Sequence, residues 1–169
     1  MKRSHDHQPD PKLDLVFERY VDVPREWVWD AWTRPDLLMQ WFCPKPWQTI
    51  ECQIDLRPGG LFRTVMHGPE GERLENLGCY LETIDHEKLV WTNALKKGFR
   101  PAGEADLKSG CGVGFFVCVL TFETKGKGTA YKAVLLHSDE ATRKHHEEVG
   151  FRDGWGAAYE QMVELLKKR

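Results

Sequence analysis

The chain has 169 residues, of which 41% are hydrophobic and 30% are charged, and its formal net charge is −2 at pH 7. A chain of this length buries about two-thirds of its unfolded surface around one core, so we expect a single globular domain and neither disorder nor a membrane protein. Proteins that hold nucleic acid by its phosphates need a surplus or a stripe of basic residues, which this sequence lacks. No nucleic-acid partner is therefore expected.

The N-terminal segment, residues 1–12, is charged, contains two prolines and has few apolar side chains. Such a segment cannot bury enough surface to order itself, so we expect a disordered or flexible tail followed by one domain over residues 13–169. The segment lacks the apolar stretch of a secretory signal, and no later run approaches the roughly 18 apolar residues of a membrane span. We expect a cytoplasmic protein with no membrane span.

The cysteines are an odd set without a C-x-x-C pair: Cys43, Cys52, Cys79, Cys111 and Cys118. This pattern argues against a disulfide framework and against a zinc knuckle. We expect reduced thiols in the core and in loops.

The first predicted elements are a strand and two short helices. Residues 13–23 largely alternate apolar and polar side chains and end at a proline, which is typical of a half-buried strand. That proline, Pro24, suits the first position of a helix over residues 24–33. A second proline then opens another short apolar helix over residues 35–42.

Six further strands are predicted from residue 46 onward, because the composition becomes rich in β-branched and aromatic residues with a period of two. Turn-forming residues separate most of them by distances suited to hairpins, so an antiparallel meander is expected. The exception is residues 96–112, a connection with four glycines, and a loop of that length is usually functional or mobile. The six strands cover residues 46–56, 59–68, 74–84, 88–95, 113–123 and 128–138.

The C-terminal segment predicts a long amphipathic helix. Trp155, Tyr159, Met162 and Leu166 follow one another at spacings of four, three and four, which places them on one side of a helix. Asp153 suits the N-cap or the first turn. A helix of roughly 15 residues is about 22 Å long and needs a sheet to cover its apolar side. The sequence therefore predicts an α+β fold.

Four segments in this order resemble the AHSA-type domain, named for an activator of a heat-shock-protein ATPase, within the START-related and polyketide-cyclase-like SRPBCC superfamily. They are VPREWVWDAWTRPDLLMQWF, DLRPGGLFRTVMHGPEG, GCYLE followed by KLVWT, and HEEVGFRDGW. The resemblance implies the helix-grip fold: a curved antiparallel sheet of about seven strands around a long C-terminal helix, with two short helices after the first strand. It also implies an apolar cavity between sheet and helix, but fold does not fix function.

Strand alternation and the helix stripe indicate which side chains face that cavity. Aromatic side chains fill cores as well as ligand pockets, so core packing is the alternative for each of them. Thr64 and Asn93 would be polar groups that orient a ligand, or would hydrogen-bond to neighbouring backbone. The predicted ligand-binding residues are Phe62, Thr64, Met66, Tyr80, Trp91, Asn93, Phe116, Cys118, Leu120, Trp155, Tyr159 and Met162.

No catalytic arrangement can be read from the sequence, and three residues remain as weak candidates. Glu82 is the only acid in the middle of an apolar strand segment, and it would share a face with Tyr80. The alternative for Glu82 is a solvated position or an ion pair with an arginine such as Arg63. Asn93 and His137 are the other polar side chains expected near the cavity.

Metals and cofactors are not expected. His145 and His146 join His137 near one mouth of the sheet, but adjacent histidines cannot point the same way, so the spacing favours no metal site. There is no G-x-S-x-G elbow, P-loop or dinucleotide-binding glycine pattern.

Three functions remain open. The first is binding of an apolar small molecule that is lipid-, polyketide- or flavonoid-like. The second is a cyclase- or dehydratase-like enzyme that uses polar cavity residues. The third is a chaperone-associated protein-binding module, but the co-chaperones that name the family carry an additional N-terminal domain, for which this chain has no room, so a chaperone partner is not expected. The sequence leaves a homodimer open.

Overall fold

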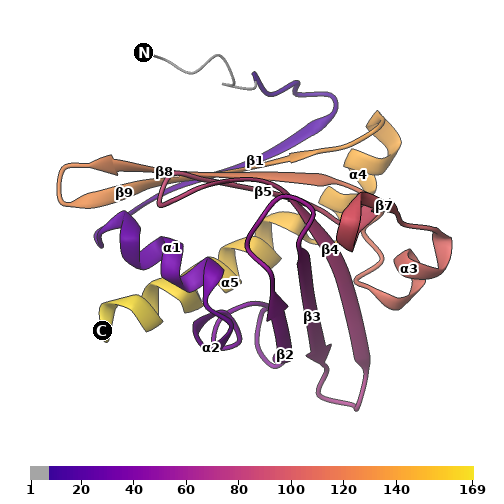
Figure 1. Cartoon of the computed structure of the whole chain (residues 1–169), viewed down its shortest axis with the longest axis horizontal. Coiled ribbons are helices and arrows are strands. Elements are labelled where there is room, and N and C mark those ends of the chain that lie inside the picture. Colours follow the sequence, from indigo (N-terminus) through magenta and orange to yellow (C-terminus); the bar gives the residue numbers. More distant parts are fainter. Residues whose placement is uncertain (1–7) are drawn as a thin grey trace.

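The computed structural model describes residues 8–169 (Figure 1). Of the predicted tail at residues 1–12, residues 1–7 lie outside the described residues. Residues 8–12 lead into a turn in which the amide of Asp14 donates to the carbonyl of Asp10, and the amide of Asp10 donates to the Asp14 carboxylate. This turn brings the chain to the first strand.

The core of the fold is one antiparallel sheet of seven strands, as the sequence predicts. Its order is β1-β9-β8-β5-β4-β3-β2. Strands β2 to β9 of this sheet follow one another as a meander, and β1 forms the edge beside β9. A separate two-stranded hairpin, β6 and β7, lies within the long connection after β5. The strands are β1 (Asp14–Val21), β2 (Gln48–Ile54), β3 (Leu61–His67), β4 (Arg73–Ile84), β5 (Lys88–Thr92), β6 (Leu95–Lys96), β7 (Arg100–Pro101), β8 (Val117–Lys125) and β9 (Gly128–Leu136).

Two short helices follow β1 and a long one ends the chain, which confirms the helix-grip arrangement. The helices are α1 (Arg25–Thr33), α2 (Pro35–Leu38), η1 (Lys97–Phe99), α3 (Glu104–Ser109), α4 (Glu140–Glu148) and α5 (Phe151–Lys167). Figure 1 shows the sheet curving over α5, with β2, β3 and β4 bending down beside it and α1 and α2 at its C-terminal part. No helix within residues 8–169 is long and apolar enough to cross a membrane.

The long helix packs as its stripe predicts. Tyr159, Met162 and Leu166 are buried, and Trp155 is partly buried against the same core. Asp153 lies in the first turn of α5, because the helix begins after Gly150 rather than at the aspartate. A carboxylate in a first turn still interacts favourably with the helix dipole.

Helices α3 and α4 were not predicted. Asp139 caps α4 by accepting a hydrogen bond from the amide of Thr142 at 2.7 Å. Gly150 separates α4 from α5 with a φ of 103°, a left-handed conformation that glycine adopts without strain. This tight connection places α4 directly before the first buried residue of α5, Phe151.

Candidate functional site

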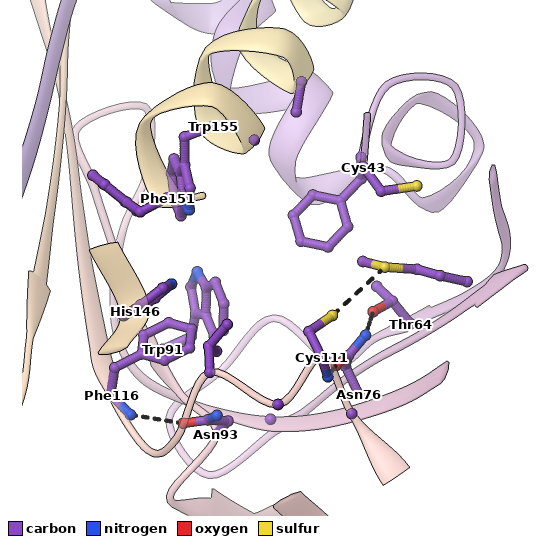
Figure 2. Close-up of a pocket in the computed structure, with 18 of the residues that line it drawn as sticks. Cys43, Thr64, Asn76, Trp91, Asn93, Cys111, Phe116, His146, Phe151 and Trp155 are labelled. Atoms are coloured by element: carbon purple, nitrogen blue, oxygen red, sulfur yellow. Dashed lines mark hydrogen bonds between the residues drawn. The ribbon is translucent and has the colours of Figure 1, made fainter. Parts of the chain in front are cut away.

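A cavity of about 280 Å³ lies between the sheet and α5 (Figure 2). Strands β3, β4 and β5 form one side of it, and α5 forms the other. The end of α1 and the segment after α2 close it from a third direction, and the segment from α3 to Gly114 closes it from a fourth. The loop expected to be functional or mobile, residues 96–112, thus contributes to the wall through its second half.

Eight aromatic side chains surround this cavity and contact one another in a closed circuit, which we call the aromatic circle. Neighbouring ring centroids lie between 5.0 and 6.2 Å apart, within the range of favourable aromatic pairs. The members come from β3, β5, the residue before β8, α4, α5, α1 and the segment after α2. In order they are Phe62, Trp91, Phe116, His146, Phe151, Trp155, Trp32 and Phe42, and all of them line the cavity.

Most polar side chains in the cavity wall are already bonded to the protein. Asn93 donates from Nδ2 to the carbonyl of Gly114 at 2.8 Å and accepts the amide of Phe116 at Oδ1 at 2.9 Å. Asn76 donates to Thr64 Oγ1 at 3.5 Å and accepts the amide of Cys111 at 3.2 Å. Asn93 therefore bonds to neighbouring backbone, the alternative considered above, whereas Thr64 accepts from the side chain of Asn76.

One histidine of the aromatic circle is held by a second histidine behind it. Nδ1 of His137 lies 2.9 Å from the carbonyl oxygen of Leu13, and Nε2 of His137 lies 2.9 Å from Nδ1 of His146. Because a carbonyl only accepts, His137 carries its proton on Nδ1, and its Nε2 accepts from Nδ1–H of His146. The remaining nitrogen of His146, Nε2, is then an acceptor.

Burial keeps both rings neutral. Desolvation lowers the pKa of His137, and it lowers the pKa of His146 to about 4, with the neighbouring imidazoles of His137 and His145 adding to the effect. At pH 7 the hydrogen-bond directions just described therefore hold.

Trp91 carries a buried donor that has no partner. Its side chain is 7% exposed, and its Nε1 makes no hydrogen bond within residues 8–169. Figure 2 shows the indole of Trp91 in the wall between Phe116 and Trp155. Trp32 Nε1 also lacks a well-formed hydrogen bond, but it lies close to the hydroxyl of Tyr131. Burial raises the pKa of that hydroxyl, and the contact with Trp32 partly lowers it. Within residues 8–169, Trp91 Nε1 has no comparable neighbour.

The structure brings eight of the twelve predicted ligand-binding residues to the cavity wall: Phe62, Thr64, Met66, Trp91, Asn93, Phe116, Trp155 and Tyr159. Four others are buried in the core beyond the wall: Tyr80, Cys118, Leu120 and Met162. These four share a face with lining residues, but neighbouring side chains cover them. On each of these faces, some of the predicted residues line the cavity and others belong to the core.

The three catalytic candidates do not converge. Glu82 lies outside the cavity and forms an ion pair with Lys88 at 3.1 Å, not with Arg63. A bulge explains this: Tyr80 pairs with Trp91 but Glu82 pairs with Val90, so Leu81 is an extra residue that reverses the alternation.

His137 lies behind His146 and is absent from the wall, while Asn93 is engaged with backbone. The expected gathering of three histidines is also partial, because His145 bonds to the carbonyl of Gly112 at 3.0 Å instead. The structure therefore offers His146, and not His137, to an occupant of the cavity.

Sequence reasoning missed His146, Phe151, Trp32 and Phe42 as wall residues. For His146 a signal was present, since Asp139 is a favoured N-cap residue and Glu140 suits a first helical turn, which would have placed the histidine on a helix. For Trp32 and Phe42 only the packing of α1 and α2 against α5 decides between core and cavity. No local pattern marks the wall residues of the loop, such as Leu107 and Cys111.

No group of three or more histidine, cysteine and acidic side chains in the described part of the chain is arranged to hold a metal ion. All five cysteines are free.

Comparison with known proteins finds one matching family and several solved structures with the same fold. The sequence matches the family described as Activator of Hsp90 ATPase homolog 1-like protein over residues 22–167. A crystal structure of a protein from Nitrosomonas europaea is 43% identical, with a TM-score of 0.87, covering 95% of this chain and 97% of that one. No curated protein matches the sequence.

More distant structures share the fold alone. A protein from Rhodobacter sphaeroides is 21% identical with a TM-score of 0.79, over 95% of this chain and 97% of that one. A protein from Arthrobacter aurescens is 19% identical with a TM-score of 0.78, over 96% and 91%.

Proposed function

The chain belongs to the family of Activator of Hsp90 ATPase homolog 1-like proteins, and we propose that this member binds a small apolar or aromatic molecule in the cavity between its sheet and α5. The aromatic circle carries the proposal. In an ordinary protein core the side chains are in contact on all sides, and few voids are larger than a water molecule. Here eight rings contact one another in T-shaped or tilted pairs around a space that they do not fill.

The size of the cavity supports a small ligand. Its volume of about 280 Å³ is close to the lower end of the roughly 300–1,000 Å³ found for small-molecule pockets. A compound of one or two fused rings fits this space better than a long-chain lipid or a tetracyclic polyketide. Burial of its apolar surface would supply most of the binding free energy.

Binding is favoured over a cyclase- or dehydratase-like reaction. An enzyme of that kind needs an acid and a base that face the same substrate. Glu82 is paired with Lys88 on the outer face, and Asn93 uses both ends of its amide to hold backbone. The free thiols agree with a reducing compartment such as the cytoplasm, which we propose as the location.

Two glycines on α5 provide a test. A Cβ added at Gly154 or at Gly156 meets no atom within 4 Å, but only Gly154 lines the cavity. Replacing either glycine by leucine improves helix propensity by about 1 kcal/mol, and Gly154→Leu also extends a side chain into the cavity.

The experiment measures binding of methylnaphthalene to the wild type and to both variants by isothermal titration calorimetry and thermal unfolding. We expect binding and a raised unfolding temperature for the wild type and Gly156→Leu, because a ligand of the folded state stabilises it. We expect no binding for Gly154→Leu. Equal binding to Gly154→Leu, or no stabilisation of the wild type by any aromatic compound of this size, would contradict the proposal.

A further inference from the structure

One part of the cavity wall combines a donor and an acceptor in otherwise apolar surroundings. The ring of Phe116 packs against Trp91 at 5.4 Å and against His146 at 5.2 Å between centroids. Trp91 and His146 therefore flank the same phenyl ring. Figure 2 shows all three side chains together in one part of the wall, below Phe151.

The donor is the indole N–H of Trp91. Leaving a buried donor without a partner costs free energy, so native proteins satisfy nearly all of them. Trp91 is more than nine-tenths buried and its Nε1 has no partner within residues 8–169. An oxygen atom of a bound molecule would satisfy it.

The acceptor is Nε2 of His146. The carbonyl of Leu13 fixes the proton of His137 on Nδ1, and His137 in turn fixes the proton of His146 on Nδ1. Nε2 of His146 makes no hydrogen bond within residues 8–169, and the ring lines the cavity. Because burial keeps the ring neutral at pH 7, this nitrogen accepts and cannot donate.

The side-chain amides in the wall and the carboxylate of Asp106 already have partners within the protein. The amides of Asn93 and Asn76 hold Gly114, Phe116 and Cys111, and the carboxylate of Asp106 accepts the amide of Gly103 at 2.8 Å. Polar recognition of an occupant therefore depends chiefly on Trp91 and His146.

We propose that the occupant of the cavity is an apolar compound bearing a hydroxyl group, an alcohol or a phenol, whose O–H donates to Nε2 of His146 and whose oxygen accepts from Nε1 of Trp91. This proposal rests on the proposed function and names its ligand class. A hydroxyl is the smallest group that donates and accepts at once. His137 acts as a positioning residue, because it sets the tautomer of His146.

Three probes of similar shape separate the two hydrogen bonds: naphthol, methoxynaphthalene and methylnaphthalene, each substituted at the same ring position. Naphthol donates and accepts, the methoxy compound only accepts, and the methyl compound does neither. We expect calorimetric affinities to fall in that order, with naphthol at least about tenfold tighter than methylnaphthalene, since each unmade buried hydrogen bond weakens binding by about this factor.

Two substitutions assign the preference to the residues. Asparagine at position 146 can keep a donor toward His137 but lacks the distal nitrogen, so His146→Asn should reduce naphthol to the affinity of the methoxy compound. Trp91→Phe should weaken naphthol and methoxynaphthalene more than it weakens methylnaphthalene, because the first two lose a hydrogen bond in addition to ring contacts. The control is Trp29→Phe, a buried tryptophan outside the cavity wall, which should keep the full order.

The outcomes separate this proposal from the one on which it rests. Equal affinities of the three probes for the wild type, or a naphthol preference over methylnaphthalene that neither substitution reduces, would overturn the hydroxyl assignment while cavity binding stands. Absence of binding for all three probes would overturn both. A naphthol preference over methylnaphthalene that falls in both His146→Asn and Trp91→Phe, with folding shown by circular dichroism, would support the assignment.

Discussion

Nε2 of His137 lies 2.9 Å from Nδ1 of His146, and the two buried imidazoles bond to each other with no carboxylate between them. Such a neutral pair can take up at most one additional proton at low cost, because two positive charges at this distance repel each other. Through two hydrogen bonds the pair links Leu13, the residue before β1, with the end of β9 and with α4. Its protonation state therefore affects both the fold and the cavity wall.

The first prediction concerns acid stability. Burial lowers the pKa of His146 from its ordinary 6.5 to about 4, so the unfolded chain binds more protons than the folded chain between these values. The free energy of unfolding should consequently fall as the pH drops through this window, by on the order of 3 kcal/mol from His146. Urea unfolding at pH 7.5, 6, 5 and 4 measures the loss, which is complete only at the lowest of these values.

The variant His146→Asn tests that assignment, because asparagine does not titrate. The difference in unfolding free energy between wild type and variant should shrink as the pH falls. His145, Asp14 and Arg143 are the other charged groups near the pair, and they remain in both proteins. A difference that is constant from pH 7.5 to 5 would show that His146 does not carry the acid sensitivity.

The second prediction compares two tryptophans. Trp41 Nε1 donates to the carbonyl of Ala31 at 3.0 Å, whereas Trp91 Nε1 has no partner in the described chain. Trp41→Phe should lower the unfolding free energy by about 1–3 kcal/mol more than Trp91→Phe does, because only the former breaks a buried hydrogen bond. Denaturant unfolding of the ligand-free proteins measures both. Equal losses would mean that Trp91 has a partner in solution.

The third prediction concerns the segment before β8, which Asn93 holds through Gly114 and Phe116. Asn93→Ala removes two short hydrogen bonds, to Gly114 and Phe116, and should cost about 2–3 kcal/mol. Asn76→Ala removes two longer ones, at 3.5 and 3.2 Å, and should cost less. Chemical denaturation of the two variants side by side decides the order. A larger loss in Asn76→Ala would contradict it.

The fourth prediction concerns Glu82. Because its ion pair with Lys88 is partly exposed, Glu82→Gln should change the unfolding free energy by less than about 1 kcal/mol. Its location on the outer face predicts that affinity for methylnaphthalene is unchanged as well. Calorimetry on the variant measures the affinity, and a clear loss would show that Glu82 contributes to the binding site.

The sequence predicted the fold well because the fold depends on periodic patterns. The spacing of Trp155, Tyr159, Met162 and Leu166 fixes one face of α5, and alternation fixes the inner face of β3 through Phe62, Thr64 and Met66. Such patterns persist along whole elements, so one irregular residue does not hide them.

The site was less predictable because single residues decide it. One extra residue, Leu81, turns Glu82 to the outer face, and a strand pattern does not reveal a bulge. His146 reaches the wall only through α4 and the left-handed turn at Gly150. Whether Trp32 lines a cavity or fills a core depends on packing between elements distant in sequence.

A crystal structure of the protein with naphthol tests the central claim most directly. We predict ring density inside the aromatic circle, between Phe62 and Trp155, with the hydroxyl oxygen within hydrogen-bonding distance of Trp91 Nε1 and His146 Nε2. A cavity filled only by ordered water under saturating naphthol, or naphthol bound solely elsewhere on the molecule, would contradict the account.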